Sequence, residues 1–233
     1  MNDLLSIIYR PRFEFNAVKN NQVNYIIILL ILLLLTIIQG VVFFPVQEQM
    51  MVHNDVFANM PTEQAEKAKA MGQSMKYFGL LAAGVIYIIK ILVQALMVWG
   101  GVAIFKGKID FKQSVLLMSL VSFITIIGDF ANVGVIFFTG VENVTSMADV
   151  YKIGLNLLIN PETAGLPLYT FFSYINPFQI WSIILIIIGL KVISELQSSD
   201  ATILCMILWL IWVAFPVAGV VIAELARSKA GPY

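Results

Sequence analysis

Two ionisable residues lie inside long apolar segments of this sequence, where a charge is expensive. Lys90 falls within the apolar run 77–105, and Asp129 falls within the run 113–139. A charged side chain at the centre of a bilayer costs about 2.5–3.5 kcal/mol on insertion scales, so such residues usually pair or face a polar cavity. If the runs are antiparallel membrane helices, the two depths differ by roughly 5 Å. We therefore expect Lys90 and Asp129 to face one another inside a helix bundle.

Further polar side chains extend both positions into stripes at helical spacing. Gln94 follows Lys90 by one turn, and the stripe around Asp129 repeats at intervals of three and four residues. The candidate intramembrane polar site comprises six residues: Lys90, Gln94, Ser122, Thr125, Asp129 and Asn132. Two explanations remain open. The stripes form either a polar pathway or binding groove, or a buried ion pair that holds two helices in register.

The residues of conventional catalytic sites are missing from the sequence. It has no Gly-rich phosphate loop, no nucleophile with a histidine base and no cluster of metal ligands. Its one histidine, His53, lies in a polar segment, and its one cysteine, Cys205, lies in an apolar run. Lys and Arg number 14, as do Asp and Glu, so no excess charge points to nucleic acid. We expect no enzymatic activity, no cofactor, no metal and no nucleic-acid partner.

The composition is typical of a protein whose solvent is the lipid bilayer. Hydrophobic residues make up 60% of the chain and charged residues 12%, with a mean hydropathy of +0.89. Soluble domains carry about 25% charged residues. A helix needs about 20 apolar residues to cross a bilayer, and five runs meet or approach that length: 23–44, 77–105, 113–139, 177–193 and 202–225. The predicted fold class is all-α, a polytopic membrane helix bundle with five transmembrane helices and short interfacial helices.

The predicted organisation is a single membrane domain with short extensions. Residues 1–22 form an amphipathic N-terminal arm, residues 23–225 the five-span domain and residues 226–233 a short tail. The connections 61–75 and 146–159 both repeat apolar residues at helical spacing. We expect each to be an amphipathic helix lying on the same face of the membrane.

The fourth span begins at an interruption of the apolar sequence. Residues 166–175 are apolar but too short to cross alone, and Asn176 and Pro177 follow them. Proline suits the first turn of a helix, where its missing N–H costs nothing. We expect a short outer helix or a bend, then a new span from Pro177. One long helix kinked at the proline is the alternative.

The distribution of positive charge indicates the orientation. Lysine occurs three times in the short connection 106–112, and the positive-inside rule is strongest for short connections close to the spans. This places that connection, and with it the N-terminus, in the cytoplasm. An odd number of spans then places the C-terminus outside.

Two regions of the chain resemble the Ypt-interacting-protein (YIP) domain family. The first is the arm, and the second contains the start of the fourth span and the turn after it. The segments that carry the resemblance are Ile7-Ile8-Tyr9-Arg10-Pro11, Asn176-Pro177-Phe178-Gln179-Ile180-Trp181, Ile188-Gly189-Leu190 and Ser198-Ser199-Asp200-Ala201. The resemblance implies five spans and a cytoplasmic N-terminus. Eukaryotic members bind small GTPases through long N-terminal regions and carry an Asp-Leu-Tyr-Gly-Pro motif, both of which this sequence lacks. We therefore expect a bacterial-type member without GTPase binding.

The expected function follows from the resemblance and from the lack of catalytic residues. The first hypothesis is a non-enzymatic scaffold or accessory subunit of a complex in the bacterial cytoplasmic membrane, such as an ATP-binding-cassette exporter. Its partners would be the lipid bilayer and other membrane proteins, either exporter subunits or further copies of the chain. The alternative is a small channel or carrier whose polar site contains Lys90 and Asp129.

Overall fold

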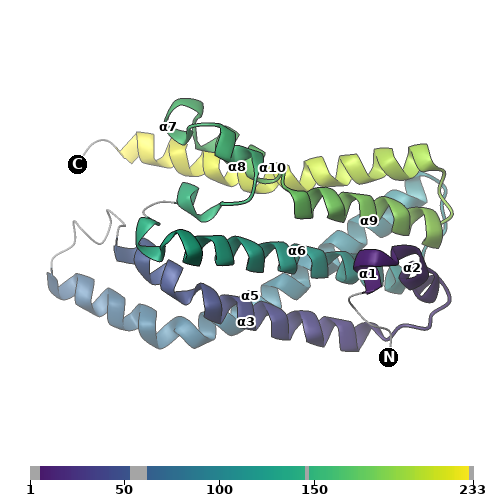
Figure 1. The fold of residues 1–233 in the computed structure, drawn as a ribbon, viewed down its shortest axis with the longest axis horizontal. Coiled ribbons are helices and arrows are strands. Elements are labelled where there is room, and N and C mark those ends of the chain that lie inside the picture. Colours follow the sequence, from purple (N-terminus) through teal and green to yellow (C-terminus); the bar gives the residue numbers. More distant parts are fainter. Residues whose placement is uncertain (1–5, 53–61, 145–146, 231–233) are drawn as a thin grey trace.

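The computed structural model describes residues 6–52, 62–144 and 147–230. These residues form an elongated bundle whose long helices run roughly side by side (Figure 1). The long helices are α3 (Tyr25–Val52), α5 (Thr62–Ile104), α6 (Phe111–Thr139), α9 (Pro177–Ile193) and α10 (Ser198–Ala230). The shorter segments are α1 (Ser6–Tyr9), α2 (Pro11–Lys19), η1 (Val141–Asn143), η2 (Met147–Val150), η3 (Leu155–Leu158), α7 (Pro161–Ala164) and α8 (Leu166–Ser173). No strand occurs in the described ranges, and the all-α prediction is confirmed.

Within the described residues, four helices are long and apolar enough to cross a membrane: Tyr25–Met50, Met75–Ile104, Phe111–Thr139 and Ser198–Ala226. Helices α8 and α9 pass the same test together and are bent by 56° at the break between them. Counting the bent pair as one broken span gives five, the number expected from the sequence. The described chain begins and ends at opposite ends of the bundle (Figure 1), as an odd number of crossings requires.

The break between α8 and α9 is built around Asn176. Its side-chain oxygen accepts a hydrogen bond from the Gln179 backbone N–H at 2.9 Å, which caps α9, and Pro177 occupies the first turn. Its amide nitrogen donates to the Ser173 carbonyl at 3.0 Å, at the end of α8. One side chain therefore satisfies backbone groups on both sides of the break. The new helix predicted from Pro177 is confirmed, and it passes the test for a membrane span only together with α8.

The core of the bundle is built around α6. Most of this helix is buried, and α3, α5 and α9 all pack against it. It begins with a capping box in which the Asp110 N–H donates to the Gln113 side-chain oxygen at 2.9 Å. The Gln113 amide also donates to the Lys19 carbonyl of the arm at 3.1 Å, so the start of α6 is joined to the end of α2.

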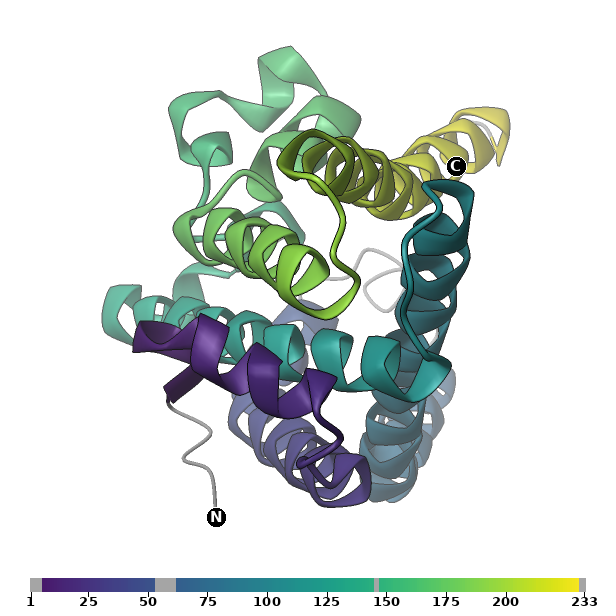
Figure 2. The same ribbon diagram turned by 90° about the vertical axis from the view of Figure 1, so that its right-hand side faces the viewer.

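The N-terminal arm packs against its own bundle. Figure 2 looks at the end of the molecule that carries the arm and shows α2 lying across it, against α6 and α9. Ile7, Phe15 and Val18 are fully buried in the main apolar core. Glu14 is also buried and accepts a hydrogen bond from the Ser6 hydroxyl. The apolar face predicted for this arm is therefore covered by protein, whereas Phe13 on the opposite face is exposed.

The two connections predicted as amphipathic helices have different outcomes. Within 61–75, residue 61 lies outside the described residues, and the rest is helical and forms the beginning of α5. For 146–159 the predicted helix is wrong: residue 146 lies outside the described residues, and the rest contains two short 3-10 helices, η2 and η3, separated by the non-helical residues 151–154. The reason is a tertiary contact: Asn132 donates to the Val150 carbonyl at 2.6 Å and accepts from the Lys152 N–H at 2.7 Å. These bonds hold the backbone in an extended turn where a helix would have needed the same groups.

Candidate functional site: a polar cavity inside the bundle

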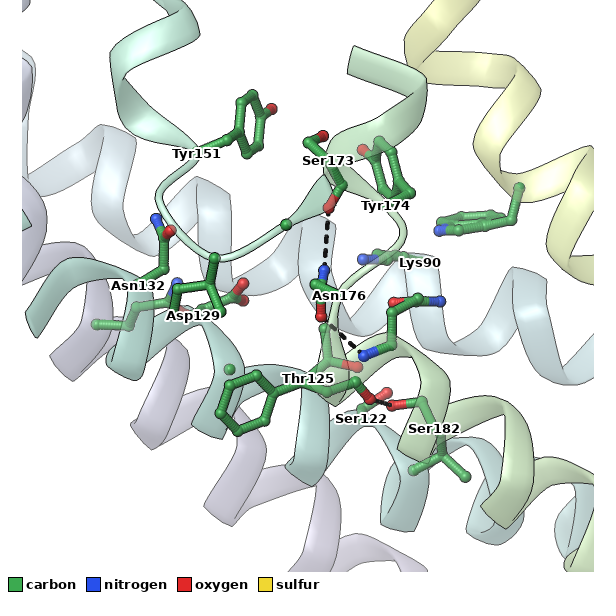
Figure 3. A pocket seen from close by; sticks show the side chains of 18 of the residues that line it. Lys90, Ser122, Thr125, Asp129, Asn132, Tyr151, Ser173, Tyr174, Asn176 and Ser182 are labelled. Atoms are coloured by element: carbon green, nitrogen blue, oxygen red, sulfur yellow. Dashed lines mark hydrogen bonds between the residues drawn. The ribbon is translucent and has the colours of Figure 1, made fainter. Parts of the chain in front are cut away.

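A cavity of about 330 Å³ lies among α3, α5, α6, α10 and the break between α8 and α9. The stretch between η2 and η3 closes part of its wall. All six residues predicted as an intramembrane polar site line this one cavity: Lys90, Gln94, Ser122, Thr125, Asp129 and Asn132. The structure thus brings both predicted stripes to the same space (Figure 3).

Helix α6 supplies the polar wall of the cavity. Its stripe runs from Ser122 to Asn132, and Asn132 also fixes the connecting backbone through its two hydrogen bonds. Beside the cavity, α6 approaches α9 very closely at Gly128. A Cβ added there would lie 2.8 Å from the Cβ of Phe178, closer than atoms of this kind pack. Glycine at this position therefore allows the contact that closes this side of the cavity.

Asp129 and Lys90 share the cavity without touching. In the described part of the chain no direct ion pair joins them, although each charge acts on the other. The side chain of Gln39, on α3, lines the cavity as well. Figure 3 shows Asp129 with Asn132 and Lys90 on opposite sides of Asn176. Lys90 and Asp129 thus face the same cavity inside the bundle, and among the described residues no direct ion pair joins them.

Aromatic rings take the place of the carboxylate around Lys90. Its ammonium lies 5.3 Å from the centroid of the Tyr87 ring and 5.5 Å from that of Trp212. Both distances are within the range of cation–π attraction, which contributes about 0.5–2 kcal/mol depending on solvation. The Tyr87 hydroxyl in turn donates to the Ser122 carbonyl at 3.4 Å, which joins α5 to α6. The rings hold the ammonium on its own side of the cavity and leave Asp129 accessible.

A family model described as Yip1 domain matches residues 5–220. The matched region includes the arm, every apolar helix that lines the cavity and both sides of the α8–α9 break. The chain belongs to the Yip1 domain family. This confirms the family expected from the sequence. No curated protein and no solved structure gives a significant match to the chain.

Several residues of the cavity in this Yip1 domain were not predicted from the sequence. Gln39 interrupts the first apolar run, and its polarity could have indicated a cavity residue. Trp212 lies in the last apolar run and resembles a packing residue. Tyr151, Tyr174 and Asn176 come from connections, where polar residues are ordinary and do not stand out. Burial, and then the nearby negative charge of Asp129, raise the pKa of the Tyr151 hydroxyl. Tyr151 therefore remains a neutral hydrogen-bonding group.

The chemistry available in the cavity is recognition of a polar molecule. Lys90 and Asp129 supply one charge of each sign, and hydroxyl and amide groups supply donors and acceptors. Among the described residues, no three His, Cys, Asp or Glu side chains gather as a metal site. The volume of about 330 Å³ falls at the lower end of the roughly 300–1,000 Å³ that small-molecule sites occupy.

Proposed function

We propose that this Yip1-domain protein is a non-enzymatic membrane protein that binds a small polar ligand in its intramembrane cavity, as a carrier does. The observation that supports the proposal is the placement of Lys90 and Asp129 on one cavity without an ion pair between them. A structural ion pair would join the two groups, because an unpaired charge away from water is costly. Two charges held apart around open space instead present themselves to a ligand.

The broken fourth span supports the same proposal. Non-helical backbone at membrane depth is tolerated where it lines a cavity, and carriers use the ends of broken helices to contact their substrates. Here the break is capped by Asn176, and Ser173, Tyr174 and Gln179 around it all line the cavity. The start of α9, with its positive end of the helix dipole, faces the ligand space.

A binding screen on the purified full-length chain tests this function. Small polar solutes are added one at a time, and the midpoint of thermal unfolding is measured in mild detergent. A ligand of the cavity should raise the midpoint for the wild type and lose that effect in Asp129→Asn. Thr36→Val is the matched control, because Thr36 is a polar residue of a span that bonds its own helix at Leu32 and does not line the cavity. A ligand effect that survives Asp129→Asn and Lys90→Met would contradict the proposal.

A second candidate function is that of a scaffold or accessory subunit of a membrane complex, such as an ATP-binding-cassette exporter. It is favoured by α10, whose membrane segment is only 11% buried within the chain. Large side chains such as Phe215 and Ile222 remain exposed along it, which leaves an apolar face for lipid or a neighbouring subunit. Recovery of a stoichiometric membrane partner in a mild-detergent pull-down supports this role, and recovery of the chain alone opposes it.

We also propose that the end of the bundle carrying the arm faces the bacterial cytoplasm. Four exposed lysines lie at this end of the bundle: Lys106 and Lys108 on the α5–α6 connection, Lys112 in the first turn of α6 and Lys191 in the last turn of α9. Clusters of this kind remain on the cytoplasmic side. Single-cysteine reporters test the orientation, because Cys205 is buried and gives little background. An impermeant maleimide should label Glu142→Cys in intact cells but not Lys108→Cys, and the reverse pattern refutes the orientation.

A further inference from the structure

The cavity presents one positive and one negative charge to its contents. Among the described residues that line it, Lys90 and Asp129 are the only charged side chains, so the formal charge of the wall is zero. The two lie on different helices and on different sides of the space (Figure 3). Neither has a direct partner of opposite charge in the described part of the chain.

This arrangement selects the charge pattern of the ligand. A simple anion at Lys90 would be repelled by Asp129, and a simple cation at Asp129 would be repelled by Lys90. Both repulsions are strong, because the interior of the bundle screens charges far less than water does. A molecule that carries both a positive and a negative charge pairs with Asp129 and Lys90 at once and leaves no charge buried without a partner.

The surroundings of each charge indicate which chemical group it receives. The Asp129 carboxylate accepts the N–H donors of a primary ammonium, whereas the rings that would enclose a quaternary ammonium lie at Lys90 instead. Lys90 shares the cavity with the start of α9, whose positive end of the helix dipole adds to the charge of the ammonium, and this combination suits a carboxylate or phosphate. The volume of about 330 Å³ fits a ligand of amino-acid or headgroup size.

We propose that the cavity binds a zwitterionic ligand, with its primary ammonium at Asp129 and its anionic group at Lys90. The inference rests on the proposed function, since it names the ligand class of the same cavity. Two sources share this chemistry. One is a free small zwitterion such as an amino acid, and the other is the headgroup of phosphatidylethanolamine, which can enter the bundle from the bilayer.

The test compares zwitterions with molecules that carry one sign of charge only. sn-Glycero-3-phosphoethanolamine and L-serine are titrated against the full-length protein in detergent, beside ethanolamine and inorganic phosphate, with affinity measured by calorimetry. At least one zwitterion should bind roughly tenfold or more tightly than either singly signed ion, because each such ion leaves one of the two charged side chains unpaired. This comparison uses the wild type alone and does not depend on any variant folding.

Variants assign the two ends of the ligand. Asp129→Asn should weaken the zwitterion roughly tenfold or more and let inorganic phosphate bind better than it does to the wild type. Lys90→Met should weaken the zwitterion to a similar degree and improve ethanolamine binding. Thr36→Val should leave all affinities unchanged, because this side chain lies away from the cavity.

The two sources are separated by reconstitution. Protein in phosphatidylcholine nanodiscs, with or without added phosphatidylethanolamine, is examined by native mass spectrometry for retained lipid. Retention of phosphatidylethanolamine that Asp129→Asn abolishes identifies the lipid source, and tight binding of soluble L-serine identifies the free solute. Suppose that ethanolamine or phosphate binds as tightly as the zwitterions, and that Asp129→Asn changes this binding. That result overturns the zwitterionic ligand class but still supports binding of a small polar ligand in the cavity. No binding of any probe and no retained lipid overturns both.

Discussion

Removal of the Phe15 ring tests how the N-terminal arm is held. Phe15 is fully buried, and its ring packs against α9 where that helix has Gly189. A Cβ added at Gly189 would lie 3.3 Å from the nearest ring atom, so the ring rests directly on the α9 backbone. Phe15→Ala would leave a cavity between α2 and α9 that the glycine cannot fill.

The expected cost is large compared with what the exposed ion pair of the arm contributes. Truncation of a fully buried phenylalanine to alanine costs about 3–5 kcal/mol, from lost burial and from the cavity left behind. Exposed ion pairs contribute about 0–1 kcal/mol each, so the Lys19–Glu195 pair cannot offset that loss. A change of this size raises the population of the undocked arm by roughly 100-fold or more.

Hydrogen exchange of the amides of residues 12–19 measures the undocking directly. In Phe15→Ala these amides should exchange faster by a factor of that order, while the amides of α6 keep the protection of the wild type. Phe13→Ala is the matched control on the same helix, because Phe13 is 63% exposed and its truncation leaves no cavity. Equal exchange in the two variants, or no change in Phe15→Ala, would show that the arm is not held by this contact.

Two further predictions concern the contacts between neighbouring elements. Gly101→Val should destabilise the protein by about 1–3 kcal/mol, because an added Cβ meets the buried Leu204 side chain of α10; Gly100→Val, which meets nothing within 4 Å, should be close to neutral in the same thermal unfolding assay. The hydrogen bond and positive charge of Lys19 lower the pKa of the Glu195 carboxyl. The ion pair therefore contributes to the stability of the folded state above the pKa of an unfolded glutamate, and this contribution disappears as the pH falls through the lowered pKa. The stability difference between wild type and Glu195→Gln should therefore shrink toward acid pH, and a difference that grows there would be incompatible with this ion pair.

The membrane helices could be predicted from the sequence because apolar length is a one-dimensional property. Hydropathy located every helix that passes the length test. It detects only the part of a helix that is apolar enough to lie in lipid, however, and not the full length of the helix. For this reason α3 continues to Val52 and α10 to Ala230, beyond the runs that ended at 44 and 225. Polar residues continue a helix in water as readily as apolar ones, and no change of hydropathy marks where it ends.

The connection after α6 shows what the apolar rhythm could not indicate. The spacing over 146–159 suggested one helix, yet Asn132 binds the backbone at Val150 and Lys152 from another element. Local propensity is a weak preference, and two tertiary hydrogen bonds outweigh it. Asn132 was identified as a polar face residue, but its partners become apparent only once the chain is folded.

The cavity was predictable in its membrane residues and not in its geometry. A polar side chain in an apolar helix is costly in lipid, so the residues around Lys90 and Asp129 stand out in the sequence and converge in the fold. Depth along a helix, however, gives no lateral distance. The rings of Tyr87 and Trp212 compete for the ammonium, and the second of them lies on a helix distant in sequence. An ion pair was one of the two explanations that the sequence left open. The fold instead has a cavity that is lined by two separated charges.

Two asparagines make this cavity a built feature of the fold. Asn176 satisfies backbone groups on both sides of the α8–α9 break, and Asn132 satisfies both a carbonyl and an N–H of the connection that faces it. Backbone groups left unpaired away from water would cost several kcal/mol, and a chain without these side chains would relieve that cost by closing the gap or forming helix. Each asparagine instead stabilises irregular backbone at the edge of the cavity. The open space beside Asp129 is thus held by hydrogen bonds from two walls, and the proposed ligand would meet a site whose shape is already formed.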